Sequence, residues 1–467
     1  MSGVPPAVVK AERLTLPRSV TQVFSTLISF EALFVLFVFA GRFKADPRLA
    51  WLPVDATALT AVVSFAVGLL VWLRRGCRVP RNALPLLVLW FALVWWVQCS
   101  LVWTLGHDYA SSKALSLAIL GSWSLLGPAL LIAPDPRRMQ RFFRMFLLMA
   151  VLTALDITVI FITNPGARFI QALGGGYLGA GFALATAVLI IWGHILYTSA
   201  GVTTRVLRIL IFAWLLGATV VLAGRSPLLG ALAGMMLPLY AGLRLRVRSA
   251  ADLTVRRRVL WALLLILAIG LVTAYASEKS DRLQALQRWR TVFEAPEGGD
   301  STAIRLSYYP LSLQLWGQSP IIGYGIGSWP VLAGFGDVRG FPHNLILETL
   351  VELGLVGTIL LVAVVFSAWR AMGGWRGARH SPTRMVLAML LLFHCMMALG
   401  HGELAEQRLL FTVLGLMPML RIPLGLGGAL TRLAPSNGEE PRGKGQQRAS
   451  EVPQPGAGQA SQEAPEG

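Results

Sequence analysis

Charged and titratable side chains are scarce in this sequence, and those that adjoin long apolar runs are the first candidates for chemistry. His343 lies in Phe-Pro-His-Asn, directly before an apolar run that begins at residue 344. Because imidazole titrates near neutral pH, His343 is a candidate general base. Pro342 favours extended backbone for Phe341 and marks the boundary of the helix that follows. The alternative is that His343 or Asn344 only caps this helix.

Glu348 and Glu352 are four residues apart in the same run and therefore share one face of the predicted helix. An ionisable group inside a membrane span is an indication of function. On an ideal helix of about 100° per residue, Glu352 lies opposite His343 and Glu348 is well rotated from it. We therefore predict that both carboxylates are structural or pair with arginines. A catalytic or substrate-contacting role is the alternative.

Arg225 is the only charged residue between Arg208 and Arg244, and it lies in Gly-Arg-Ser-Pro between two apolar runs. An arginine keeps its charge and binds phosphate oxygens through two parallel hydrogen bonds. The sequence thus indicates a phosphate-binding residue at the outer end of a tight hairpin. The alternative is an arginine that only extends to the membrane surface.

Three further basic residues are expected on the same side of the membrane. Arg168 follows Asn-Pro-Gly-Ala, Lys113 follows His-Asp-Tyr, and Arg305 begins a stretch with regularly spaced apolar residues. Together they would line a basic pocket for an anionic, lipid-linked substrate. Each is equally suited to anchoring a span at the lipid headgroups.

A glycine-rich stretch, Gly-Tyr-Gly-Ile-Gly, occupies 323–327. It does not match GxGxxG and has no strand–turn–helix context, so we exclude a nucleotide-binding motif. Its glycines are expected to permit a tight turn.

The elements that position these residues are predicted to be membrane helices. The sequence has 467 residues, of which 55% are hydrophobic and 14% charged, whereas soluble domains carry about 25% charged residues. Apolar runs of the roughly 20 residues that cross a bilayer recur along the chain. The predicted fold class is an all-α polytopic membrane protein.

The net charge of +18 would favour nucleic acid as a partner of a soluble protein. In a membrane protein, basic residues retained on the cytoplasmic side explain it better, so no nucleic acid is expected. The three cysteines, Cys77, Cys99 and Cys395, have no ligand spacing to one another or to histidine. Neither a disulfide framework nor a metal site is predicted.

About twelve transmembrane spans are predicted within a domain at 20–432. The first apolar run is too long for a cleavable signal and is expected to remain as a span. The predicted spans are 20–40, 55–73, 84–105, 113–133, 142–163, 177–199, 207–223, 226–243, 259–276, 344–368, 385–401 and 408–427. The last is the weakest, because Pro418, Arg421 and Pro423 interrupt it.

Loop charges orient these spans. With residues 1–19 in the cytoplasm, most of the 41 Lys and Arg residues fall on the cytoplasmic side, as the positive-inside rule requires. Both termini are then cytoplasmic, and residues 433–467, rich in Gly, Pro, Gln, Glu and Ser, are expected to be a disordered tail.

One long outer loop, 277–343, carries charged and aromatic residues, which favours a functional role over disorder. Within it, residues 305–316 have apolar side chains at 306, 309, 313 and 316. That spacing predicts an amphipathic helix at the membrane surface.

The order of these pieces resembles the O-antigen ligase and O-antigen polymerase superfamily, the WaaL and Wzy proteins. The matching features are the turn Gly224–Ser226 between two spans, a long outer loop in which Arg305 starts a helix that ends in Ser-Pro-Ile-Ile-Gly-Tyr-Gly-Ile-Gly, and a closing His343-Asn344. Leu-Glu and then Glu-Leu-Gly-Leu-Val-Gly follow. The resemblance covers about 220–370 by motif and the whole chain by topology.

The resemblance implies a metal-independent, inverting membrane glycosyltransferase of the GT-C type, without cofactors, at the periplasmic face of the bacterial inner membrane. The donor it implies is a glycan on undecaprenyl pyrophosphate. By position, Arg225 and Arg305 match the arginines that hold the pyrophosphate, and His343 matches the histidine that takes the proton of the acceptor hydroxyl.

Several alternatives stay open. A ligase transfers glycan to lipid A core, whereas a polymerase joins repeat units to a growing polysaccharide, of O-antigen or exopolysaccharide type. One dominant outer loop, with only a short one at 164–176, favours a ligase. A transporter or flippase of lipid-linked glycans would spread charges through the core and show internal symmetry, and a non-enzymatic scaffold leaves the basic outer face unexplained.

Overall fold

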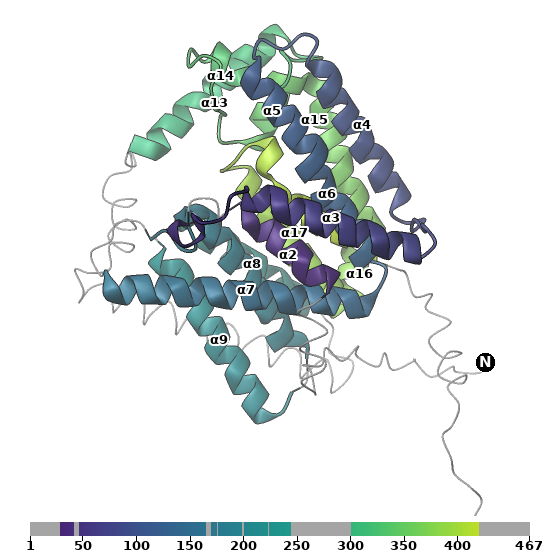
Figure 1. The fold of residues 1–467 in the computed structure, drawn as a ribbon, viewed down its shortest axis with the longest axis vertical. Helices are drawn as coiled ribbons and strands as arrows, with labels where there is room; N and C mark the ends of the chain where they lie inside the picture. The colour runs from purple at the N-terminus through teal and green to yellow at the C-terminus, as the bar shows by residue number, and fades with distance from the viewer. Residues whose placement is uncertain are drawn as a thin grey trace, which may run out of the picture. The chain divides into compact units, whose positions relative to one another are not determined.

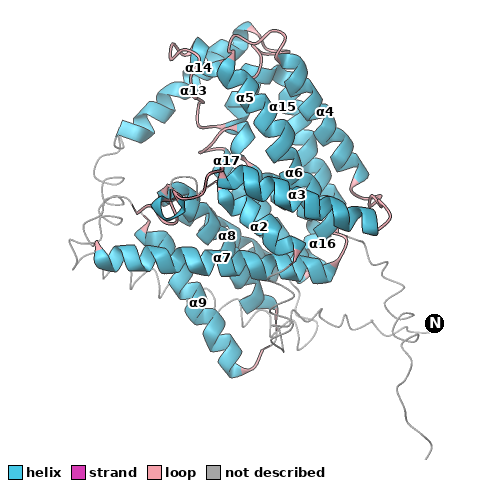
Figure 2. Ribbon diagram, in the orientation of Figure 1, coloured by secondary structure: helices cyan, strands magenta, loops and turns pink. Residues whose placement is uncertain are grey.

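The computed structural model describes residues 29–41, 46–164, 170–174, 176–198, 200–222, 224–243 and 300–419. These residues form helices and connecting loops, with no β-strand among them (Figure 1, Figure 2). The predicted span at 259–276, the first part of the outer loop and both terminal segments lie outside the described residues.

The helices differ widely in length. They are α2 (Phe30–Ala40), α3 (Ala56–Arg74), α4 (Leu84–Ser100), α5 (Asp108–Ser116), α6 (Ser122–Gly127), α7 (Pro136–Thr163), α8 (Tyr177–Tyr197), α9 (Val202–Val221), α10 (Arg225–Leu243), α13 (Asp300–Gln318), α14 (Trp329–Leu332), α15 (Leu345–Ala371), α16 (Gly374–His380), α17 (Pro382–Ala398) and α18 (Arg408–Leu416). Short π-helical turns, Leu117–Gly121 and Pro128–Ile132, continue α5 and α6, so that 108–132 is one helical run.

Six described helices are long and apolar enough to cross a membrane: Ala56–Arg74, Asp108–Ile132, Pro136–Thr163, Tyr177–Tyr197, Val202–Val221 and Leu345–Ala371. Four shorter apolar helices accompany them: Phe30–Ala40, Leu84–Ser100, Ser226–Ala241 and Pro382–Ala398. The all-helical membrane class is confirmed for the described part of the chain. The count of twelve spans and their orientation stay predictions. The described part of the twelfth, which ends at residue 419, is helical over Arg408–Leu416.

Glycines allow the helices that carry the site to approach one another closely. In α10, a Cβ atom on Gly230 would lie 2.8 Å from the Phe393 ring of α17, and one on Gly234 would lie 2.9 Å from Leu189 of α8. Small residues at such contacts are typical of membrane helices, because close backbone approach maximises van der Waals packing where lipid offers no hydrophobic drive.

Helix α15 is broken at Gly354, where φ is +66° and ψ is −166°, a conformation essentially restricted to glycine. The break leaves backbone groups without partners inside the helix. The loop after α13 supplies those partners: Tyr324 N and Gly325 N donate to the carbonyls of Val351 and Glu352 at 2.9 and 2.8 Å. In return, the amides at 355 and 356 donate to the carbonyls at 320 and 321, at 2.8 and 3.2 Å.

The glycines at 323–327 make this insertion possible. Gly323, Gly325 and Gly327 have φ of +70°, +92° and +74°. A Cβ atom on Gly323 would lie 2.6 Å from the backbone of Glu352, and one on Gly327 would lie 2.7 Å from Cα of Ala110. The stretch is therefore a close-packing loop that joins the run 108–132 to α15. The sequence predicted only a tight turn here, and the structure adds the packing contacts to that prediction.

Helix α13 contains the predicted helix at 305–316, but its buried face differs from the apolar spacing. Ser312 and Leu315 are buried, whereas Leu306 and Leu313 are exposed. The buried side packs on Trp329, whose indole nitrogen donates to Ser312 Oγ at 3.0 Å. The exposed leucines are left free to contact a membrane surface.

Candidate active site

Arg305, in α13, contacts a histidine that the sequence did not single out. Its Nη1 lies 3.2 Å from Nδ1 of His401, in the loop after α17. The other ring nitrogen of His401, Nε2, lies 2.5 Å from Oγ of Ser226, the second residue of α10. One buried imidazole thus connects two segments that are far apart in sequence.

His343 adopts a strained backbone conformation between α14 and α15. Its φ is +58°, in the left-handed region that few non-glycine residues occupy. Its ring lies edge-on against Phe341, with 4.6 Å between centroids. Asn344, and not His343, caps α15, because its Oδ1 accepts hydrogen bonds from the amides of Ile346 and Leu347 at 3.0 and 3.2 Å. The helix cap, which was the alternative role for His343, is therefore provided by Asn344.

Both histidines are held in the neutral form. Burial, and to a smaller extent the charge of Arg305, lower the pKa of His343 to about 4. Burial lowers the pKa of His401 to about 4 as well, with contributions from Arg305 and His343. The three side chains therefore interact electrostatically, and at neutral pH each imidazole has one nitrogen without a proton, which acts as an acceptor.

Lys113, Glu348 and Glu352 form a second, buried cluster. The ammonium of Lys113 lies 2.6 Å from Glu348 Oε1 and 2.7 Å from Glu352 Oε2. This geometry fits the structural role expected for the two carboxylates, although their partner is a lysine and not an arginine. The charge of Lys113 is balanced by these two groups, so the structure does not place it as a free cation beside Arg305.

This charged cluster also fixes the segment that carries His401. Glu348 Oε1 accepts a hydrogen bond from the amide of Leu404 at 3.1 Å. One residue earlier, Glu403 accepts from the Tyr109 hydroxyl at 2.8 Å and from Arg339 Nε at 3.3 Å. The short loop 399–407 is thereby tied to α5, to α15 and to the loop that leads to His343.

Of two further predicted arginines, the structure describes only the backbone of one and nothing of the other. Arg225 opens α10, directly before Ser226, so its backbone lies beside the site, while its side chain lies outside the described part of the structure. Arg168 lies outside the described residues altogether. Their predicted roles stay predictions.

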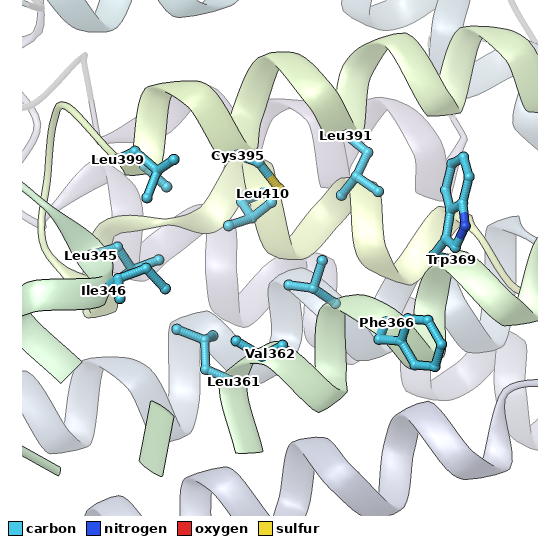
Figure 3. Close-up of a pocket in the computed structure, with 12 residues that line it drawn as sticks. Leu345, Ile346, Leu361, Val362, Phe366, Trp369, Leu391, Cys395, Leu399 and Leu410 are labelled. Atoms are coloured by element: carbon cyan, nitrogen blue, oxygen red, sulfur yellow. The ribbon is translucent and has the colours of Figure 1, made fainter. Parts of the chain in front are cut away.

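An apolar cavity of about 460 Å³ lies among α15, α17 and α18. Leu345 and Ile346 line one end and Phe366 and Trp369 the other (Figure 3). Its lining, from α15, α17 and α18, consists of Leu345, Ile346, Leu361, Val362, Val365, Phe366, Trp369, Leu391, Cys395, Ala398, Leu399 and Leu410. Leu345 in this lining is two residues along the chain from His343, so an apolar surface begins close in sequence to the candidate base.

Residues 210–362 match a family model described as O-antigen ligase. Over this region, about a third of its length, the chain is similar to the O-antigen ligase family. The match runs from α9 into α15 and contains Arg225, Arg305 and His343, in agreement with the region of about 220–370 that the motifs predicted. No curated protein matches the sequence.

Neither Lys113 nor His401 lies within the matched residues of the O-antigen ligase domain. His401 was missed because the sequence places it at the end of an apolar run with no motif around it. A signal was nevertheless present, since the predicted topology puts residue 401 at the same outer surface as His343.

Proposed function

We propose that this protein is an inverting glycosyltransferase at the periplasmic face of the bacterial inner membrane, with both termini in the cytoplasm. It transfers a glycan from undecaprenyl pyrophosphate to an acceptor hydroxyl. The observation that carries this proposal is the grouping of Arg305 with two neutral histidines, His343 and His401, in a chain whose residues 210–362 match an O-antigen ligase model.

In the proposed reaction, His343 takes the proton of the acceptor hydroxyl as its oxygen attacks the anomeric carbon. The bond from that carbon to the pyrophosphate oxygen breaks on the opposite face, so the configuration inverts. The electron pair leaves with undecaprenyl pyrophosphate, whose charge Arg305 and Arg225 balance. No cofactor takes part in this scheme, and no metal ion is required by it.

The low pKa of His343 makes it a weak base until the donor arrives. Burial and Arg305 lower that pKa to about 4 in the free site. A bound pyrophosphate would neutralise Arg305 and bring negative charge close to the ring, and both effects raise the pKa of a histidine. The base would thus become effective when the leaving group is in place.

The apolar cavity supplies a place for the lipid of the donor. Because the tail is already in the bilayer, it gains van der Waals packing in the cavity and no hydrophobic transfer energy. With the tail between α15 and α17, its pyrophosphate would lie near Leu345, two residues from His343. The bilayer provides the remaining apolar surroundings.

For the acceptor, we propose lipid A core, as in O-antigen ligation, because one long outer loop dominates the predicted topology. Polymerisation of O-antigen or exopolysaccharide repeat units is the alternative within the same chemistry. Deletion of the gene followed by gel analysis of envelope glycans separates them. Polymer retained on the carrier with bare lipid A core means ligase, and single-repeat products mean O-antigen polymerase.

Two other outcomes of that deletion have different meanings. Loss of secreted polysaccharide with normal lipopolysaccharide means an exopolysaccharide polymerase. Accumulation of complete lipid-linked units on the cytoplasmic leaflet means a flippase, and would contradict the proposed transferase.

A further inference from the structure

We propose that His401 is a positioning residue of the transferase site, which holds the Arg305 guanidinium and turns the Ser226 hydroxyl toward the pyrophosphate of the donor. This inference rests on the proposed function and gives a role to His401, which no motif contains, and to Ser226, which lies in the predicted turn Gly224–Ser226 but had no role assigned to it. It follows from the direction of two hydrogen bonds.

The first hydrogen bond fixes the tautomer of His401. A guanidinium has donors and no acceptor, so Nδ1 of His401 must accept from Nη1 of Arg305, 3.2 Å away. The proton of the neutral ring therefore resides on Nε2. Protonation of Nδ1 would place two donors face to face and two positive charges side by side. Burial and the charge of Arg305 oppose it, and they lower the pKa of His401 to about 4.

The second hydrogen bond orients the serine. With its proton on Nε2, His401 donates to Oγ of Ser226, 2.5 Å away. Because Oγ accepts from the ring, the hydroxyl hydrogen of Ser226 is directed to another acceptor. Ser226 is in the first turn of α10, next to Arg225, where backbone amides and the helix dipole also favour an anion.

Arg305 itself has spare hydrogen-bonding capacity. Its Nε atom is buried and has no hydrogen-bond partner among the described residues. An unpaired buried donor of this kind costs free energy unless a ligand fills it. A phosphate oxygen within reach of both would accept one hydrogen bond from Nε and one from the Ser226 hydroxyl. His401 lies between Arg305 and Ser226 and sets the distance between them.

The loop that carries His401 is built to hold the ring still. Gly402 has a φ of +80°, and a Cβ atom there would lie 2.8 Å from Nε2 of Gln407. That amide donates to the carbonyls of His401 and Glu403, both at 3.3 Å. The ring also contacts Phe182 of α8, with 5.9 Å between centroids. His401 is thus fixed by its own loop as well as by its two polar partners.

The test uses variants that each remove the hydrogen bond of one ring nitrogen of His401 and keep that of the other. His401→Asn keeps an oxygen near the Nδ1 position for Arg305 but loses the donor to Ser226. His401→Gln keeps an amide donor near Nε2 but loses the acceptor for Arg305. Ser226→Ala removes only the hydroxyl. The full-length protein, purified in detergent, is titrated with undecaprenyl pyrophosphate, and affinity is followed by tryptophan fluorescence.

We expect His401→Asn and Ser226→Ala each to weaken binding by about 10-fold, the usual effect of losing one hydrogen bond to a charged group. The double variant should bind no more weakly than His401→Asn alone, because both changes remove the same hydroxyl contact. His401→Gln should weaken binding through a misplaced Arg305, and adding Arg305→Gln should then have little further effect. A residue with a merely structural role would not show this pairwise coupling.

The matched control is His380→Asn, on the exposed end of α16, which should bind as the wild type does. Independent, additive losses in the double variant, or wild-type affinity in both His401→Asn and Ser226→Ala, would overturn the assignment of His401. If His401→Asn does not fold, Ser226→Ala alone still decides, since wild-type affinity in that variant contradicts the proposal. Failure of the wild-type protein to bind undecaprenyl pyrophosphate would instead overturn the proposed function itself.

Discussion

His343 is the candidate base and also has a strained, left-handed backbone. Its effect on catalysis and its effect on stability can therefore be measured separately. A non-glycine residue at a φ of +58° carries roughly 1 kcal/mol of strain. We expect His343→Gly and His343→Ala both to lower transfer by about 10²- to 10⁴-fold, the usual contribution of a general base. His343→Gly should raise the thermal unfolding midpoint relative to His343→Ala, because only glycine relieves the strain.

Transfer assays on purified protein, paired with thermal unfolding in detergent, check this prediction. Full activity in either variant would contradict the assigned role of His343. A lower midpoint for the glycine variant would contradict the strain.

The lowered pKa of His343 predicts an unusual pH profile. The base must be neutral, and a pKa of about 4 in the free site keeps it neutral well below pH 6.5. The acid limb of kcat/KM, which reports the free enzyme, should therefore fall near pH 4. In Arg305→Gln the residual activity should lose its acid limb at a higher pH, because a positive charge that lowers the pKa of His343 has been removed.

Steady-state rates between pH 4 and 8, with the donor limiting, measure the acid limb of the wild type and the acid limb of Arg305→Gln. An acid limb near 6.5 in the wild type would show that the ring is not shielded as the structure indicates.

At the scale of single elements, the break in α15 depends on Gly354. A methyl group at this position would meet the carbonyl of Ile321, and the φ of +66° disfavours any side chain. We expect Gly354→Ala to lower the unfolding midpoint and to reduce activity, since the loop 319–327 loses its place on the helix. Gly217→Ala in α9, where nothing lies within 4 Å of the added atom, is the control and should be neutral.

Thermal unfolding of both variants in the same detergent provides the measurement. Equal midpoints for Gly354→Ala and Gly217→Ala would contradict the role of the break.

The Lys113 cluster leads to a second prediction about elements. Lys113→Met leaves two buried carboxylates without a counter-ion, which costs roughly 3–5 kcal/mol when one partner of a buried pair is removed. Adding Glu348→Gln and Glu352→Gln removes the uncompensated charge. The triple variant should therefore be more stable than Lys113→Met alone, a comparison that denaturant titration or folded yield in membranes measures. A triple variant less stable than the single one would show that the ion pairs stabilise by more than charge balance.

At the scale of the whole molecule, the apolar cavity predicts how the site distinguishes lipid donors. Val362→Trp, in the cavity lining, should raise the KM for the undecaprenyl-linked donor by roughly 10-fold, because the bulky ring displaces buried isoprenoid. Val62→Trp on the exposed side of α3 is the control. A donor with a short isoprenoid chain should be affected less by Val362→Trp, and equal effects on both donors would argue that the tail lies elsewhere.

Some of this architecture was accessible from the sequence, and the reason is visible in particular residues. Apolar runs predicted the long apolar helices in the described residues, because transfer of an apolar segment into lipid is a local, nearly additive property. Asn344 was among the predicted caps for the same reason, since a cap acts on amides two and three residues away. The spacing predicted an apolar face of α13 for the membrane surface, and Leu306 and Leu313 of that face are exposed in the protein, so this placement stays a prediction. The other face, where Ser312 and Leu315 pack against Trp329, could not be predicted, because helical periodicity does not contain that contact.

By itself, the sequence determined the all-helical membrane class, the similarity of residues 210–362 to the O-antigen ligase family and the identity of His343 and Arg305 as candidates. Only the tertiary structure decided which charges meet. Lys113 and Glu352 are 239 residues apart, and His401 is 96 residues from Arg305. A hydrogen bond or an ion pair depends on angles and on distances of a few tenths of an ångström, and neither follows from composition or periodicity. The fold therefore brings polar residues that are far apart in the sequence together, so that His401 contacts both Arg305 and Ser226.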